Sequence, residues 1–157
     1  MAMAVVSMTH RRLMASGAAK ESPPTYSPEW PAGFQDASVK QWVRDYYRTI
    51  DNKEAPSQAA VDFYADEAVI QLGRRHLDRA TLLQMSAASW DAVESRRHNP
   101  KQAYPLGGDE YLVEGDATYV YKNGESKSFE WCGKLHLVRR HGRWAMDYYK
   151  TYFATEY

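Results

Sequence analysis

The chain has 157 residues, 44% of them hydrophobic, which is a usual size for one domain and enough for one core. Its 20 basic and 20 acidic residues balance, so the composition disfavours nucleic acid and anionic membranes as partners. Cys132 is the only cysteine, which excludes an internal disulfide and a cysteine-built metal site and agrees with a reducing, cytoplasmic setting. No apolar run approaches the roughly 18 residues of a membrane span.

Residues 1–37 are expected to form a disordered or loosely attached N-terminal tail. Residues 1–20 contain basic side chains, Ala and Ser but no acid, so an organellar transit peptide is an alternative. The next stretch holds four prolines and cannot be regular structure. Three aromatic residues could attach the tail to the domain or to a second subunit: Tyr26, Trp30 and Phe34.

The folded part, residues 38–157, is expected to begin with three helices. Their expected ranges are 38–50, 57–64 and 79–93, with a strand over 68–72 before the third. Ser38, Ser57 and Asp78 are the expected caps, because their side chains can accept hydrogen bonds from the first amides of a helix. In the first and third ranges, apolar residues then recur at the spacing of one helical face.

From about residue 97 onward the apolar period changes from 3.6 to 2, which predicts strands. The expected strands cover 98–106, 110–122, 126–140 and 143–153, and tight-turn dipeptides at 107–108, 123–124 and 141–142 join them. Helices followed by hairpin-joined strands predict an α+β fold, in which a helical layer covers one face of a mostly antiparallel sheet.

Two different faces alternate along the last two strands. An apolar face holds Phe129, Trp131, Gly133, Leu135, Leu137, Trp144, Met146 and Tyr148. A mixed face holds Glu130, Cys132, Lys134, His136, Val138, Asp147, Tyr149, Thr151 and Phe153. Either the apolar face packs on the helices and the mixed face is solvated, or the apolar face joins another subunit and the mixed face lines a pocket.

Three segments are typical of one superfamily: residues 43–51 (VRDYYRTID), 63–70 (FYADEAVI) and 142–149 (GRWAMDYY). Through them the chain resembles the nuclear transport factor two-like superfamily, with most similarity to SnoaL-like polyketide cyclases and their fungal isomerase and dehydratase relatives. The resemblance covers roughly residues 38–153. It implies a cone-shaped barrel of three N-terminal helices on a curved sheet, a deep pocket, and a homodimer or trimer formed through the apolar sheet face.

A more distant likeness to scytalone dehydratases favours the mixed face as the pocket wall. It aligns a pocket histidine with His98 and an acid with Asp51. Pocket-lining positions of that family fall on Cys132, Lys134, Tyr149, Thr151 and Phe153. The two catalytic tyrosines of the family fall on Ile50 and Leu72, and its second histidine has no counterpart, so the chain is not expected to be that dehydratase.

Asp147 is the expected general base, since SnoaL-like cyclases place an acid there and aromatic surroundings disfavour its charged form. Alternatively it is an exposed acid paired with Lys134 or Lys150. His98 is the expected partner acid or base, or a histidine with no role at a strand entrance. Lys134 would polarise a substrate carbonyl, unless it only forms a salt bridge with Glu130. Asp51 is expected only to end its helix.

The expected substrate-binding residues are Tyr47, Tyr64, Glu130, Cys132, Tyr149, Thr151 and Phe153. No histidine spacing indicates a metal site, and no cofactor is expected. The function expected from the resemblance is a cofactor-independent isomerase, cyclase or dehydratase that moves protons on a small polyketide- or terpenoid-like molecule. The alternative is a non-catalytic module of the same fold that binds a hydrophobic molecule or dimerises.

Overall fold

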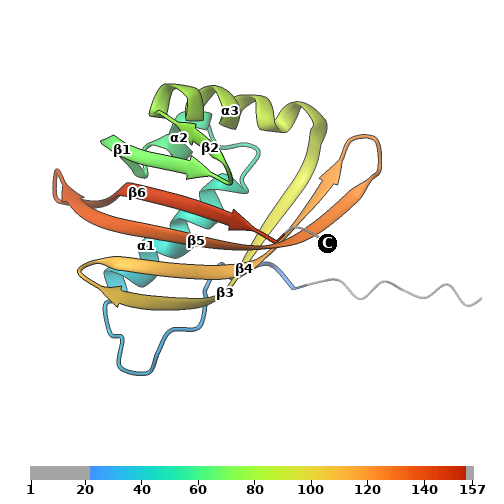
Figure 1. The fold of residues 1–157 in the computed structure, drawn as a ribbon. Coiled ribbons are helices and arrows are strands. Elements are labelled where there is room, and N and C mark those ends of the chain that lie inside the picture. The colour runs from blue at the N-terminus through green and yellow to red at the C-terminus, as the bar shows by residue number, and fades with distance from the viewer. Residues whose placement is uncertain (1–21, 155–157) are drawn as a thin grey trace, which may run out of the picture.

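The structure, a computed structural model, describes residues 22–154 as an α+β fold with a curved sheet on a helical layer (Figure 1). The elements are α1 (Ala37–Ile50), α2 (Ser57–Val61), β1 (Tyr64–Leu72), β2 (Arg75–Leu77), α3 (Arg79–Ala92), β3 (Val93–Gly107), β4 (Glu110–Tyr121), β5 (Ser126–Arg140) and β6 (Arg143–Phe153). The six strands lie in the order β2-β1-β6-β5-β4-β3, and only β1 and β6 pair in parallel. Within residues 22–154, no helix has the length and apolar character needed to cross a membrane.

The helical layer differs in detail from the expected three N-terminal helices. α1 and α3 have 14 residues each, whereas α2 has only five, and a second strand, β2, follows the expected one before α3 begins. α1 begins one position earlier than expected, because Asp36, and not Ser38, caps it by accepting from the amides of Ser38 and Val39. Its buried side chains include Val39, Val43 and Tyr47, so this helix anchors the core.

The four-strand meander follows the predicted hairpins. β3 pairs with β4, β4 with β5 and β5 with β6, all antiparallel. Gly108, Gly124 and Gly142 have positive φ angles in the three turns, which glycine adopts without steric cost. β3 starts at Val93, directly after α3, which is earlier than the period change near residue 97 suggests.

A bulge in β6 changes which of its side chains face the core. Leu137 pairs with Met146 and His136 pairs with Tyr148, so Asp147 is an extra residue without a partner in β5. Met146 and Tyr149 are therefore both buried, although simple alternation puts them on opposite faces. The bulge keeps Asp147 on the outer face of the sheet beside His136.

The core lies on the apolar face of β5. Trp131, Leu135 and Leu137 are buried in one cluster with residues of α1, while Glu130 on the alternate face is exposed. The prediction that the mixed face of β5 lines the pocket is therefore wrong. The chain has one core, and the helices pack against the apolar face of β5, so the mixed face of this strand points outward. The same packing leaves the Trp131 face unavailable to a second subunit.

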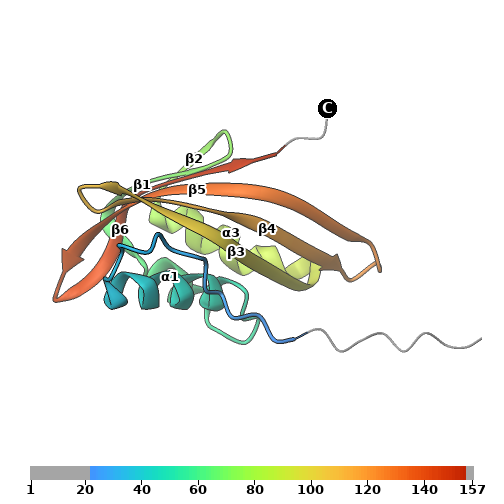
Figure 2. The ribbon, with the colours of Figure 1, turned by 90° about the horizontal axis from the view of Figure 1, so that it is seen from below.

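The described part of the expected tail packs on the sheet. Glu29 forms a parallel bridge with Gln102 at the free edge of β3. Figure 2 shows this segment running beside β3 before it enters α1. The transit-peptide alternative concerns residues 1–20, which lie outside the described residues.

Candidate active site

A cavity of about 250 Å³ lies between the helices and the concave side of the sheet. Its lining is largely apolar and aromatic, with a few polar groups: Tyr46, Ile50, Ala60, Tyr64, Leu72, Leu82, Met85, Ser86, Arg96, His98, Tyr119, Trp131, Tyr149, Thr151 and Phe153. α3 contributes Leu82 and Met85 while burying none of its side chains fully, so it forms a cover over the core without being part of it.

His98 and Asp51 form a buried pair at this cavity. Asp51 ends α1, and its carboxylate accepts from both the backbone amide and the ring of His98, at 2.5 Å and 2.6 Å. The Asp51 side chain is 1% exposed and that of His98 is 13% exposed. Because a carboxylate only accepts, Nδ1 of His98 carries the proton and Nε2 is left as the basic nitrogen. The side-chain hydrogen bond of the His98 ring goes through Nδ1, which leaves Nε2 available to accept a substrate proton.

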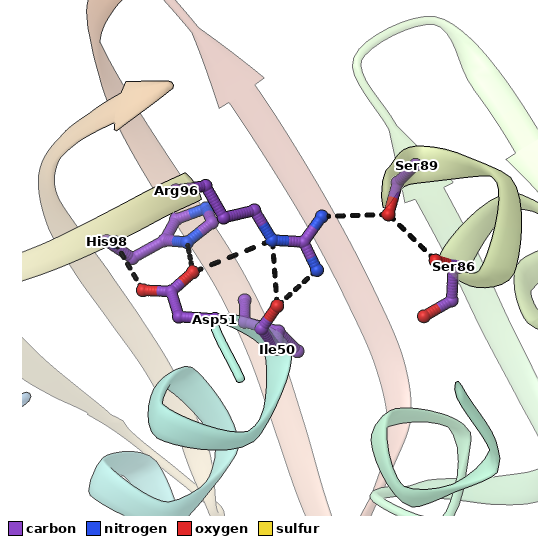
Figure 3. A network of polar contacts seen from close by, with 6 residues as sticks. All are labelled: Ile50, Asp51, Ser86, Ser89, Arg96 and His98. Carbon is purple, nitrogen blue, oxygen red and sulfur yellow. Dashed lines mark hydrogen bonds and ion pairs between the residues drawn. The ribbon is translucent and has the colours of Figure 1, made fainter. Parts of the chain in front are cut away.

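Arg96 compensates the charge of Asp51. A carboxylate at a helix C-terminus opposes the helix dipole, so Asp51 needs cationic or donor groups around it. The Arg96 guanidinium lies 3.7 Å from Asp51, donates to the Ile50 carbonyl at 2.8 Å, and reaches the Ser89 hydroxyl of α3 at 3.0 Å (Figure 3). It also stacks on the Trp90 ring at 4.2 Å. One side chain thus joins the end of α1, the His98 strand and the covering helix.

A cluster of tyrosine hydroxyls forms another wall of the cavity. The hydroxyls of Tyr46 and Tyr64 are 2.7 Å apart, and the Tyr149 ring packs edge-on against both rings, with centroids 5.8 Å from that of Tyr46 and 6.1 Å from that of Tyr64. Burial raises the pKa of Tyr149, and it raises the pKa of Tyr46, Tyr47 and Tyr64 well above their ordinary value. These hydroxyls therefore remain protonated near neutral pH and act as neutral hydrogen-bond donors.

Gly133 makes room for this cluster. A Cβ at that position would lie 3.0–3.1 Å from the ring and hydroxyl of Tyr149, closer than ordinary contacts. The hydroxyls of Tyr47 and Thr151 are buried, and within the described part of the chain they have no well-formed hydrogen bond. Buried hydroxyls without a full set of partners are costly, so the polar wall is suited to an oxygen of a bound molecule.

Comparisons with solved structures agree with this architecture. An NTF2-like protein of unknown function from Exiguobacterium sp. 255-15 superposes with a TM-score of 0.61 at 13% identity, over 73% of this chain and 99% of that one. The chain has the NTF2-like fold. A ketosteroid isomerase-like protein from Erwinia carotovora atroseptica SCRI1043 matches with a TM-score of 0.59 at 16% identity, over 76% and 96% of the two chains.

A third NTF2-like neighbour is described as a hexachlorocyclohexane dehydrochlorinase, LinA type 2. It superposes with a TM-score of 0.60 at 12% identity, over 76% of this chain and 84% of that one. No protein-family model and no curated protein matches the chain. At these identities the likeness concerns the fold, and membership of the polyketide cyclase branch stays a prediction.

The predicted catalytic residues lie on opposite faces of the sheet. His98 lines the cavity, whereas Asp147 lies on the outer face, 2.6 Å from His136, in a different hollow. Lys134 also lies on the outer face and pairs with Glu110 at 3.8 Å, not with Glu130. The prediction that Asp147 and His98 share one cavity is therefore wrong, because the bulge in β6 leaves Asp147 on the outer face while Tyr149 and Thr151 face the cavity.

The predicted substrate-binding residues divide in the same way. Tyr64, Tyr149, Thr151 and Phe153 line the cavity, and Tyr47 lies behind it with its ring 6.0 Å from that of His98. Glu130 and Cys132 line a separate hollow on the outer face, which Phe153 also borders. Within residues 22–154, no group of three or more His, Cys, Asp or Glu residues is arranged to hold a metal ion.

Sequence reasoning missed Asp51 and Arg96 as members of the site. The alignment of Asp51 with a pocket acid was one available signal. Another was the unfavourable charge of a carboxylate at a helix C-terminus, which calls for a compensating partner. Arg96 alternates with His98 along β3 and so shares its face, a relation that becomes visible only once the start of β3 is known.

Proposed function

We propose that the chain catalyses proton transfer on a compact, ring-containing ketone of polyketide or terpenoid type, as a cofactor-independent isomerase, cyclase or dehydratase. The observation that carries this proposal is the buried His98–Asp51 pair, whose free Nε2 adjoins an aromatic cavity. Isomerase-like and dehydrochlorinase neighbours of the same fold support small-molecule chemistry of this general kind.

In the proposed reaction, Nε2 of His98 removes a proton from the carbon next to a carbonyl group. The C–H electron pair forms the new C=C bond of an enolate, and the carbonyl π electrons move to its oxygen. Asp51 fixes the tautomer and stabilises the imidazolium that results, since its carboxylate already accepts from Nδ1. Return of the proton at another carbon isomerises the substrate, loss of a β-hydroxyl dehydrates it, and attack on a second carbonyl cyclises it.

The tyrosine wall suits the enolate oxygen. Its hydroxyls are neutral donors in a buried site, where hydrogen bonds to a developing negative charge are strong. The cavity of about 250 Å³ lies just below the usual 300–1,000 Å³ of small-molecule pockets, which favours a substrate of one or two rings.

The competing function is ligand binding without turnover. The predominantly apolar and aromatic lining would hold a hydrophobic molecule even if His98 moved no proton. The two functions differ in one measurable property, which is whether the protein accelerates proton exchange on a bound ketone.

The test uses 2-tetralone in D₂O and follows exchange of its α-protons by NMR, with binding measured separately from tryptophan fluorescence. We expect wild-type protein to accelerate exchange and His98→Asn to lower kcat at least a hundredfold, the usual contribution of a general base, with little change in binding. His136→Asn is the matched control, because it alters a second His–Asp pair of the same 2.6 Å length on the outer face. Binding without accelerated exchange would refute catalysis of this type and support the binding module.

A further inference from the structure

The covering helix α3 and strand β3 meet at a corner that has no loop. α3 ends at Ala92, and β3 begins at Val93. None of the α3 side chains is fully buried, so apolar packing alone holds this helix weakly over the cavity. A polar contact braces the corner from inside, because Arg96 folds back onto Ser89, seven positions earlier in the chain.

The Ser89 hydroxyl forms two hydrogen bonds in opposite directions. It donates to the Ser86 carbonyl of the same helix at 2.7 Å, and it accepts from the Arg96 guanidinium at 3.0 Å (Figure 3). A hydroxyl has a single proton, so the bond to Ser86 leaves only its oxygen lone pairs for the guanidinium. The Trp90 ring adds a second contact, with its centroid 4.2 Å from the guanidinium carbon. Two neighbouring residues of α3 thus hold the same cation.

The rest of the guanidinium contacts the buried pair. Its Nε donates to the Ile50 carbonyl at 2.8 Å and lies 3.7 Å from the Asp51 carboxylate, which accepts from the His98 ring at 2.6 Å. The Arg96 side chain is only 10% exposed, so water competes little for these contacts. Because a guanidinium is planar and rigid, fixing one of its nitrogens restrains the others. The orientation that Ser89 sets is therefore passed to the carboxylate.

We propose that Ser89 is a positioning residue that, through Arg96, couples the placement of α3 over the cavity to the geometry of the His98–Asp51 pair. This inference rests on the proposed proton-transfer function. Ser89 is not among the described residues that line the cavity, so it acts on the base only through the guanidinium. The pair is then held in one orientation while the cavity is covered, where exclusion of water strengthens the attraction between imidazolium and carboxylate.

The test is Ser89→Ala in the full chain. Alanine is the better helix former, so a loss of activity would not come from a weakened α3. We expect kcat for 2-tetralone exchange to fall about fivefold, part of the effect of losing one hydrogen bond to a charged group, with KM changed less than about twofold. Ser89→Thr keeps the hydroxyl and should restore kcat. Ser128→Ala is the matched control, because it removes a serine hydroxyl 2.9 Å from that of Thr118, away from the cavity.

Two further measurements separate coupling through Arg96 from a general structural effect. In ¹⁵N-histidine-labelled Ser89→Ala, the Nδ1 proton resonance of His98 should broaden, because a less restrained pair exchanges that proton with solvent faster. In an Arg96→Met background, which lacks the guanidinium, Ser89→Ala should lower kcat no further, since residues that act through one another have non-additive effects.

Three results overturn the inference: an unchanged Nδ1 resonance in Ser89→Ala, a kcat that Ser89→Thr does not restore, or an equal loss of kcat with and without Arg96. Should Arg96→Met fail to fold, the comparison of Ser89→Ala with Ser89→Thr still decides. If wild-type protein catalyses no exchange, the proposed function fails on its own. The Nδ1 resonance then decides whether Ser89 restrains the pair, because that measurement needs no substrate.

Discussion

Replacing Gly115 by alanine tests the close approach of β3 and β4 beside His98. A Cβ at Gly115 would overlap the carbonyl oxygen of Asn99 and would lie 2.9 Å from the Cα of Pro100. Both contacts are with backbone, so no side-chain rotation can relieve them. The strands must separate locally, and Asn99 directly follows His98 in β3.

The expected loss of stability follows from two opposing effects. Overpacking in a well-packed region costs about 1–3 kcal/mol, and a contact this short with backbone belongs at the upper end. Replacing glycine by alanine also restricts the unfolded chain, which returns about 0.4–1 kcal/mol. We therefore expect Gly115→Ala to lower the free energy of unfolding by about 2 kcal/mol or more.

Urea denaturation followed by tryptophan fluorescence measures this change, and 2-tetralone exchange measures its effect on the site. Gly33→Ala is the control, because a Cβ there meets nothing within 4 Å, so only the effect on the unfolded chain remains and the free energy of unfolding should rise by about 0.4–1 kcal/mol. If Gly115→Ala is no more destabilising than Gly33→Ala, the backbones of β3 and β4 do not approach as closely as described.

Two further changes test the helix cap and the outer face. Asp36→Ala should lower the free energy of unfolding by about 1 kcal/mol at pH 7. Hydrogen bonds from Ser38 and Val39 lower the folded-state pKa of Asp36 below 3.8. The difference in stability between wild type and variant should therefore persist down to about pH 4 and disappear in more acid solution. A difference that does not depend on pH would contradict the cap. Burial, and then the charge of Glu114, raise the pKa of the Cys132 thiol above 9.0. Iodoacetamide at pH 8 should therefore modify folded protein more slowly than urea-unfolded protein, and equal rates would refute this.

The fold could be predicted because its signals are local. The helical period of α1, the period of two in the meander and the glycine turns each act within a few residues. Which face of the sheet the helices cover could not be predicted, because the alternation of residues shows that β5 has two different faces but not which of them is buried. The homodimer or trimer and the cytoplasmic location stay predictions.

The candidate site could be predicted only in part. His98, which the likeness to a pocket histidine and its titration near neutrality both favoured, lines the cavity, as do Tyr64, Tyr149 and Thr151. Asp147 was misplaced because a single extra residue in β6 reverses the alternation, and nothing in the local sequence marks that bulge. The Asp51–His98 contact joins residues 47 positions apart, so it depends on the final packing of α1 against β3.

The position of β6 in the sheet affects how the protein assembles. This last strand of the described chain lies between β1 and β5, so within the sheet it alone pairs the β1–β2 hairpin with the other three meander strands. Tyr64 and Leu72 of β1 therefore join the cavity wall only after the most C-terminal strand has formed. During synthesis, α1 and the first meander strands emerge earlier, but a closed cavity has to wait for β6. Ligand binding by C-terminally truncated chains would report this late closure directly.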